Sequence, residues 1–378
     1  MLPIIYPDDL DAFKKAYRKI FEVPSLQKRY DAIWKSSNSI NIRNLKIENI
    51  ITGDFNALVL IATAFRAEKL SSTQNQELKE LFDYDSSQPK IADFFVKYNI
   101  ELKLSTCYFC NIDFINAFTD FSDYSSYQDF LNHANKSDLE KIPGIGNTLS
   151  EKILKVRRVL KSEEELSLAK VKSISGVGPQ IIKSIKSLCA SSTANHFTLD
   201  HLIDKASFPI LALSLFNLVP CCYSCNSKFK KSAELIDINN NNCAKVSPTS
   251  KDFDFHKKNK FKLFYKARTN SFTHINKLED FTLRLVGDTQ DKQYESYIDI
   301  FKLNARYRAH KVDVLDLVSK ISRYSPKKIN QISELLGVEE KQVYEDIIGT
   351  SLKNGELNEK PKTKLLRDIS ENIKGFNE

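Results

Sequence analysis

The sequence lacks any unbroken apolar stretch approaching the roughly 18 residues that a membrane-spanning helix needs. Its first residues, Met1 to Asp9, also lack the basic region, apolar core and small-residue cleavage site of a secretion signal. These absences predict a cytoplasmic protein with no membrane partner.

The chain of 378 residues has seven cysteines, so they cannot all pair with one another in disulfides. An odd number in a chain without a secretion signal argues against a disulfide framework and for reduced thiols that bind metal. Four of them form two pairs with two-residue spacing: Cys107, Cys110, Cys222 and Cys225. Four thiolates suffice for a tetrahedral Zn²⁺ site. Of the others, Cys189, Cys221 and Cys243, we expect Cys221 to be a small buried residue, since only Cys222 has the right spacing to Cys225.

The length predicts two or three domains at about 100–200 residues each. Apolar residues recur at helical spacing before the first cysteine pair and again near the C-terminus. We therefore expect an α-helical N-terminal domain over 1–105 and an α-helical C-terminal region over 271–378. Residues 101–107 alternate apolar and polar side chains, which predicts a strand that leads into Cys107.

Within the C-terminal region, residues 329–347 have the spacing of a helix-turn-helix around Gly337. Such a segment could read DNA. Its second helix carries four acids, which would repel phosphate: Glu339, Glu340, Glu345 and Asp346. A helical cap on the rest of the protein is therefore the preferred interpretation.

An internal repeat lies between the two cysteine pairs. The segment Ile142-Pro-Gly-Ile-Gly146 is followed 32 residues later by Ile174-Ser-Gly-Val-Gly178, and an amphipathic helix is expected after each. Glycines permit a tight turn in which backbone N–H groups can approach a phosphate. The repeat resembles a tandem helix-hairpin-helix, which implies contacts to the backbone of double-stranded DNA through Gly144, Ile145, Gly146, Gly176, Val177 and Gly178. The alternative is a tandem used only for packing.

A set of polar residues surrounds the second cysteine pair. Asp200 and His201 end a short apolar run, Asn217 lies sixteen residues after the histidine, and Asn226 follows Cys225 directly. With the four cysteines, these residues resemble the HNH endonuclease family in its zinc-ribbon variant. The resemblance implies an α+β, predominantly α-helical protein. Its ββα-metal HNH core with structural zinc would occupy 106–135 and 191–270, and a helix-hairpin-helix pair would be inserted over 136–190.

The resemblance also implies a role for each residue. His201 would be the general base that deprotonates water, because imidazole titrates near neutral pH. Asp200 and Asn226 would bind Mg²⁺ or Mn²⁺ through oxygen atoms. Asn217 would orient the loop that carries His201. Because Asp200 and His201 are adjacent, a regular strand would point them in opposite directions, so the strand must end or twist there if both serve one site.

The positive charge is unevenly distributed. From Asn226 to Asn270, eleven Lys and Arg residues stand against four acids, and this local excess nearly equals the +8 of the whole chain. Aromatic residues are interleaved with the lysines. The stretch, which includes Lys228 as a candidate DNA contact, is either a DNA-facing surface or a solvated strand edge that lysines protect from aggregation.

Taken together, these patterns predict a metal-dependent DNA endonuclease that hydrolyses phosphodiester bonds. The alternative is an inactive, zinc-stabilised DNA-binding or regulatory subunit, against which the intact set of Asp200, His201, Asn217 and Asn226 argues. The helical flanks also resemble HNH effectors of bacterial anti-phage systems, which implies an ATPase partner.

Overall fold

The computed structural model describes residues 1–35, 40–68, 70–119, 124, 126–160, 164–188, 193–240, 242–265, 272–287, 291–351 and 357–374. These residues are mainly α-helical and contain three two-stranded antiparallel sheets. The expected class, an α+β protein dominated by helices, is confirmed. No helix in the described part combines the length and apolar character required to cross a membrane.

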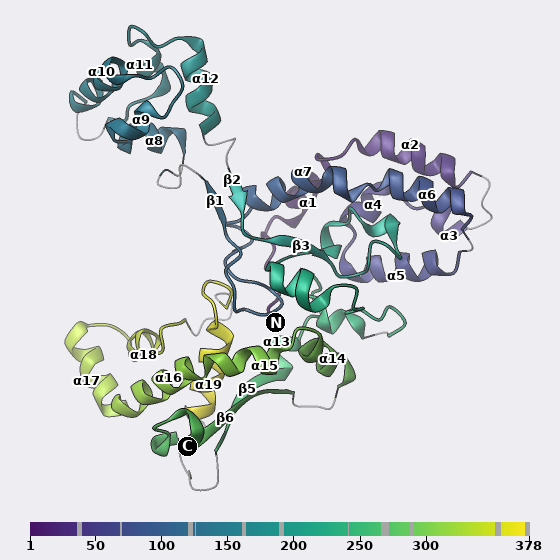
Figure 1. Cartoon of the computed structure of the whole chain (residues 1–378), viewed down its shortest axis with the longest axis vertical. Coiled ribbons are helices and arrows are strands. Elements are labelled where there is room, and N and C mark those ends of the chain that lie inside the picture. The colour runs from purple at the N-terminus through teal and green to yellow at the C-terminus, as the bar shows by residue number, and fades with distance from the viewer. Residues whose placement is uncertain are drawn as a thin grey trace. The chain divides into compact units, whose positions relative to one another are not determined.

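The chain forms two compact units (Figure 1). Unit 1 comprises Met1–Asn116 and Phe197–Glu378, and unit 2 comprises Ala117–His196. The division is simpler than the four parts expected from the sequence. The terminal helical regions belong to the same unit as the central segments, and the inserted unit extends beyond 136–190 at both ends.

Helices precede the first cysteine pair, where apolar spacing predicts them. They are α1 Leu10–Arg18, α2 Val23–Ile33, α3 Ile40–Arg43, α4 Ile47–Thr52, α5 Phe55–Arg66, α6 Ser72–Leu81 and α7 Tyr84–Lys97. Side-chain oxygens cap several of them, among them Asp54 on α5 and Ser71 on α6, because the first turn of a helix leaves N–H groups without partners. A hydrogen bond connects α1 to the loop that follows strand β3 (Thr198–His201) in unit 1. Tyr17 donates a hydrogen bond to the Leu213 carbonyl at 3.0 Å.

The segment before Cys107 is not the strand that its alternation predicts. Residues 101–103 form a turn in which Lys103 has a φ of 50°. The β-type pairing in this segment is a single bridge between Thr106 and Phe114. Leu102 and Leu104 are both buried, so the alternation reflects a turn that buries two leucines.

A β-hairpin followed by a short helix lies at the centre of unit 1. Strand β3 (Thr198–His201) pairs with β4 (Leu218–Cys221), and His201 is opposite Leu218. The loop between the strands contains the 3-10 turns η1 (Pro209–Leu211) and η2 (Leu215–Asn217). Helix η3 (Ser224–Lys230) follows β4 and is a π-helix. At its end the Lys231 N–H donates to the Asn226 carbonyl, five residues earlier, at 3.0 Å.

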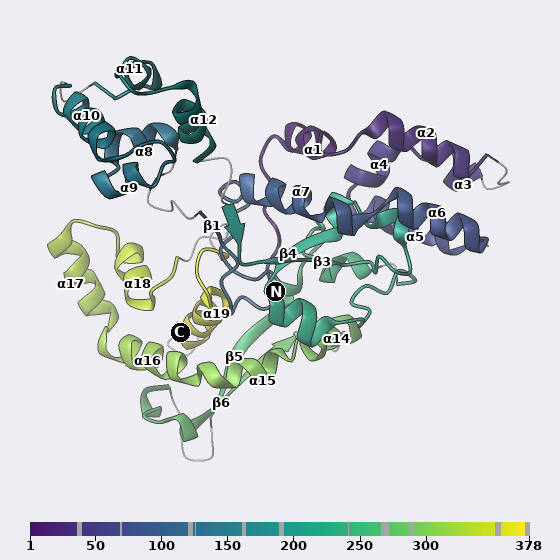
Figure 2. The same cartoon turned by 45° about the horizontal axis from the view of Figure 1, so that its top comes forward.

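The C-terminal part of unit 1 contains a second hairpin and the remaining helices (Figure 2). Its elements are η4 Cys243–Val246, α13 Phe255–Lys258, β5 Asn259–Tyr265, η5 Phe272–His274, η6 Leu278–Asp280, β6 Phe281–Gly287, α14 Lys292–Ile300, α15 Leu303–Tyr307, η7 Arg308–His310, α16 Lys311–Arg323, α17 Pro326–Leu336, α18 Glu340–Ile348 and α19 Thr363–Lys374. Gly337, with a φ of 67°, joins α17 to α18, so the 329–347 segment is a pair of helices.

Strand β6 of the second hairpin lies within the 271–378 region that the sequence predicts to be α-helical. In β6 the side chains alternate with period two: Phe281, Leu283 and Leu285 are buried, and the residues between them face outward. Side chains cap both free edges of the hairpin, which would otherwise expose unpaired backbone groups. The Phe261 N–H donates to Asp368 of α19 at 3.0 Å, and the Leu285 N–H donates to Asn304 of α15 at 2.8 Å.

Unit 2 is a helical unit that the chain enters and leaves through a pair of strands. Its elements are β1 Ala117–Thr119, α8 Tyr127–His133, α9 Lys136–Glu140, α10 Asn147–Arg158, α11 Leu168–Lys172, α12 Pro179–Leu188 and β2 Thr193–Asn195. Strands β1 and β2 pair antiparallel, with Ala117 opposite Asn195. Unit 2 has its own apolar core, to which both copies of the repeat contribute, with Ile153 and Ile185 at equivalent positions.

Candidate functional site

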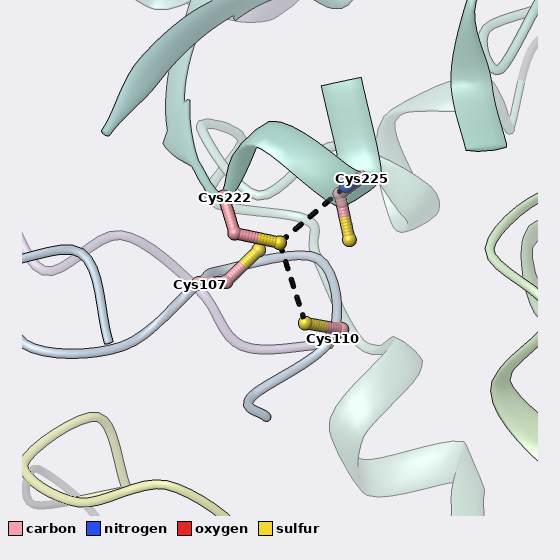
Figure 3. A group of neighbouring side chains, drawn as sticks. All are labelled: Cys107, Cys110, Cys222 and Cys225. Atoms are coloured by element: carbon pink, nitrogen blue, oxygen red, sulfur yellow. Dashed lines mark hydrogen bonds between the residues drawn. The ribbon is translucent and has the colours of Figure 1, made fainter. Parts of the chain in front are cut away.

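The two cysteine pairs come together in unit 1 (Figure 3). The sulfur atoms of Cys107, Cys110, Cys222 and Cys225 all lie within 4.8 Å of one another, and all four residues are buried. The Cys110 and Cys222 sulfurs are 3.9 Å apart. A tetrahedral site with Zn–S bonds of about 2.3 Å has S–S edges of about 3.8 Å. The cluster therefore has the donor set and the dimensions for a structural metal such as Zn²⁺.

Each pair is held by a turn of the backbone. The Asn111 N–H donates to the Cys107 carbonyl at 2.7 Å, and Asn111 adopts a φ of 53°. Backbone N–H groups also point at the sulfurs. The Ile112 N–H lies 3.4 Å from the Cys110 sulfur, and the Cys225 N–H lies 3.4 Å from the Cys222 sulfur. Such contacts stabilise thiolates, which are the form that binds metal.

The charge of the cluster indicates a need for a cation. Burial raises the pKa of the Cys107 and Cys225 thiols, and contact with the Cys107 thiol raises the pKa of Cys222. Four adjacent buried thiolates would repel one another, so a divalent metal is needed to keep all four ionised. Arg306 of α15 offsets the remaining negative charge, because its guanidinium donates to the Cys225 sulfur at 3.2 Å.

Two further cysteines of the described residues lie outside this cluster. Cys221 is fully buried, as expected, and its sulfur lies 3.6 Å from the Thr198 hydroxyl. Cys243 is buried in η4. Cys189 lies outside the described residues.

Asp200 forms a buried ion pair with Lys230, which is not among the residues predicted from the sequence. Its Oδ1 accepts a hydrogen bond from the Lys230 ammonium at 3.1 Å, and both side chains are about 95% buried. The same ammonium donates to the His201 carbonyl at 2.7 Å. The second oxygen of Asp200, Oδ2, is buried and has no hydrogen-bond partner among the described residues. Burial raises the pKa of Asp200 to about 6, although the charge of Lys230 opposes the shift.

One ring nitrogen of the buried His201 side chain is engaged in a hydrogen bond. Its Nε2 lies 2.9 Å from the Ala212 carbonyl. A carbonyl can only accept, so Nε2 carries the hydrogen and Nδ1 carries the lone pair. The ring of Tyr84, at the start of α7, lies edge-on to the imidazole with 4.5 Å between centroids. Burial lowers the pKa of His201 to about 4, so the imidazole is neutral at pH 7.

Asn217 connects both ends of the loop between β3 and β4. Its Oδ1 accepts from the Ile203 N–H at 2.8 Å, and its Nδ2 donates to the Ile203 carbonyl at 3.0 Å and to the Leu211 carbonyl at 3.1 Å. The side chain is fully buried. These three hydrogen bonds fix the backbone that follows His201.

The two other predicted residues of this region lie on η3. Asn226 is half-buried, and its side chain makes no hydrogen bond with any described residue. Lys228 is exposed. The residue that contacts Asp200 is instead Lys230, near the end of η3. The sequence contains one indication of this contact, because Lys230 lies in the basic run 228–231. Only the π-helix shows which lysine of that run turns inward.

A cleft of about 680 Å³ adjoins this region, between the α5–α6 connection and the loops after β3 and η3. Lys230 lines it, together with Asp204 and Lys231. Asp200 and His201 are not part of the lining, and each exposes less than a tenth of its surface. Lys230 therefore separates Asp200 from the open space.

The two glycine hairpins of unit 2 have the same geometry. Gly144 and Gly176 have φ values of +93° and +106°, where an L-residue would be strained. In each hairpin the residue after this glycine donates its N–H to the carbonyl three positions earlier. Ile145 donates to the Ile142 carbonyl and Val177 to the Ile174 carbonyl, both at 3.0 Å. Gly146 and Gly178 differ from the first glycines, because a Cβ atom at either would meet nothing within 4 Å.

Comparison with known proteins finds no matching family model, no matching curated protein and no matching solved structure. The functional interpretation consequently depends on the residues and contacts described above.

Proposed function

We propose that the chain is a metal-dependent DNA endonuclease that hydrolyses phosphodiester bonds. The observation that carries the proposal is the arrangement at the end of β3. His201 carries a lone pair on Nδ1, and the preceding residue, Asp200, has a buried oxygen that no described residue contacts by a hydrogen bond. The order of strand β3, strand β4 and helix η3, with a cysteine cluster beside it, also supports a ββα-metal site.

In this proposal His201 accepts a proton from the attacking water at Nδ1. The Ala212 carbonyl keeps the ring in the tautomer that this task requires, and the neutral state at pH 7 leaves the lone pair free. Asn217 holds the loop after His201 in place through the backbone of Ile203. The unpartnered Oδ2 of Asp200 suits a hard divalent cation, and Asn226 would be its second protein ligand. Bound Mg²⁺ or Mn²⁺ would supply charge stabilisation for the phosphate.

Cleavage of supercoiled plasmid with and without Mg²⁺ or Mn²⁺ tests the proposal. Wild-type protein should nick or linearise the plasmid only with the cation. The His201→Ala variant should cut about two to four orders of magnitude more slowly, the usual contribution of a general base. His133, an exposed residue of α8, provides the matched control, and His133→Ala should cut at the wild-type rate. A fully active His201→Ala protein would contradict the assignment of the site.

A second candidate function is a zinc-stabilised DNA-binding or regulatory subunit without activity. The specific observation in its favour is that Asp200 and His201 are covered and that Lys230 occupies one oxygen of Asp200. Duplex binding without cleavage in any divalent cation would favour it. The anti-phage setting and the ATPase partner stay predictions from the resemblance.

A further inference from the structure

The outward face of the β5–β6 hairpin carries positive charges that have no acidic partner in the part of the chain that the structure describes. Lys262 of β5 lies directly opposite Arg284 of β6 in the strand register, and both project from the outward side of the hairpin. Like charges directly opposite each other on neighbouring strands destabilise a sheet. Nothing in the packing of the hairpin requires this pair, because the buried side is formed by apolar residues such as Phe261 and Leu283.

A hollow of about 410 Å³ adjoins this face, between β6 and the turn from α15 to α16. Arg284, Arg308 and Lys311 supply three cationic side chains to its lining, and Thr282 and Asn304 supply polar groups. None of the lining residues is acidic. The hollow is therefore a positively charged recess beside the Lys262–Arg284 pair.

The cations on this face differ from the neighbouring Lys260, which forms ion pairs with acidic residues. Lys260, two residues before Lys262 on the same strand, pairs with Asp368 at 3.2 Å and with Glu371 at 3.3 Å. Lys262, Arg284 and Arg308 form no ion pair with any described residue. Arg284 instead lies over the exposed ring of Phe264, with 5.8 Å between the guanidinium carbon and the ring centroid.

We propose that this face binds the phosphodiester backbone of DNA, with Lys262, Arg284 and Arg308 contacting successive phosphates. The charges extend from the hollow across the hairpin, so a polyanion with regularly spaced charges complements them better than a single anion does. Two arginines favour phosphate, since a guanidinium can donate two parallel hydrogen bonds to it. The choice of DNA among polyanions rests on the proposed function.

The test uses the full zinc-loaded chain with His201→Ala as background, so that binding is measured without cleavage. Fluorescence anisotropy with a labelled duplex gives the association constant at several salt concentrations. The added double substitution Arg284→Gln and Arg308→Gln should weaken binding. It should also make the plot of log K against log salt shallower by about 1.8, or about 0.9 for each phosphate that the variant no longer neutralises.

The matched control is the double substitution Lys320→Gln and Lys341→Gln. It removes the same charge, but from lysines already paired with acids on their own helices, at 2.8 Å to Asp316 and 3.9 Å to Glu345. This control should bind duplex with the wild-type slope. Equal slopes in all three proteins would overturn the inference, and so would binding to phosphatidylserine vesicles without binding to duplex. Failure of the nuclease proposal looks different, because plasmid would stay intact while the arginine-dependent slope persisted.

Discussion

Asp200 and His201 are neighbours in the chain, but burial acts on them in opposite ways. The pKa of Asp200 is raised from 3.8 to about 6, because burial disfavours the carboxylate. The pKa of His201 is lowered from 6.5 to about 4, because burial disfavours the imidazolium. Both residues are therefore uncharged over part of the mildly acidic range, where their unfolded counterparts are charged.

These shifts predict opposite effects of pH on stability. Folded Asp200 keeps its proton up to about pH 6, so its contribution to the free energy of unfolding falls as pH rises from about 4 to about 6. Folded His201 has lost its proton above about pH 4, so its contribution rises from about pH 4 to 6.5. Urea unfolding without added Mg²⁺ measures both effects. As pH rises through this window, the free energy of unfolding of Asp200→Asn should increase by about 3 kcal/mol relative to wild type, and that of His201→Gln should decrease by about 3 kcal/mol relative to wild type. Parallel pH profiles in all three proteins would contradict the shifts.

Lys230 is predicted to be a stabilising residue as well as a neighbour of the site. Its removal in Lys230→Met leaves Asp200 buried without a counter-ion, which should cost about 3–5 kcal/mol of stability. In an Asp200→Asn background the same substitution should cost much less, because no charge is left unpaired. Lys231→Met is the control, since Lys231 is exposed, and it should change the free energy of unfolding by less than about 0.5 kcal/mol. An equal cost of Lys230→Met in both backgrounds would argue against a functional ion pair.

At the scale of elements, the π-helix η3 explains how one short segment serves two places. Hydrogen bonds from residue i to i+5 bring residues five apart onto nearly the same face. Cys225 and Lys230 are five positions apart. Cys225 belongs to the cysteine cluster, and Lys230 contacts Asp200. An α-helix of the same sequence would turn Lys230 away from β3.

In each glycine pair of unit 2, we expect substitution of the first glycine to lower stability and substitution of the second to affect DNA binding instead. Gly144→Ala and Gly176→Ala should each cost about 1–3 kcal/mol, because both positions have positive φ. Gly146→Thr and Gly178→Thr should leave stability nearly unchanged. A Cβ atom at either position meets nothing within 4 Å, and threonine is well tolerated at the start of a helix, where Gly146 caps α10.

If backbone N–H groups of these hairpins hold phosphates, the two threonine substitutions should block the approach and weaken binding to every duplex alike. The salt slope should become shallower by about one unit for each phosphate that a hairpin no longer holds. Thermal unfolding and anisotropy measured on the same proteins distinguish the two effects. Unchanged affinity and slope in the threonine variants would make the hairpins packing elements only.

Local spacing allowed much of this architecture to be predicted. Two-residue spacing identified the four cysteines, and apolar periodicity predicted the helices that precede the first pair, because these signals arise within a few residues of each other. The ion pair of Lys230 could not be predicted, since it depends on a π-helix and on packing against β3. Strand β6 was not predicted, because the whole of 271–378 was interpreted as helical and the alternation within 281–287 was not considered separately. The expected strand over 101–107 was wrong, because a turn buries both leucines there.

For the whole molecule, the cysteine cluster joins segments 112 residues apart in sequence, and Arg306 adds a contact from α15. Purified protein should contain one zinc per chain, measured by elemental analysis, and should retain it in mild EDTA. Stripping the metal, or Cys222→Ser, should unfold unit 1, because the four sulfurs would repel or separate. Unit 2 should stay helical, since its apolar core contains no metal ligand, and limited proteolysis should release it intact. Zinc-free protein with native stability would refute this account of the cluster.

The pairing of β1 with β2 brings the two junctions of unit 2 to adjacent positions, as Ala117 is opposite Asn195. Cα atoms of opposed residues in an antiparallel pair are about 5 Å apart, so a few glycines can replace everything between them. Unit 2 should therefore be exchangeable. Another module whose ends are close together could be grafted at this ribbon, and under the proposed function such a hybrid would direct cleavage to a different set of DNA sites.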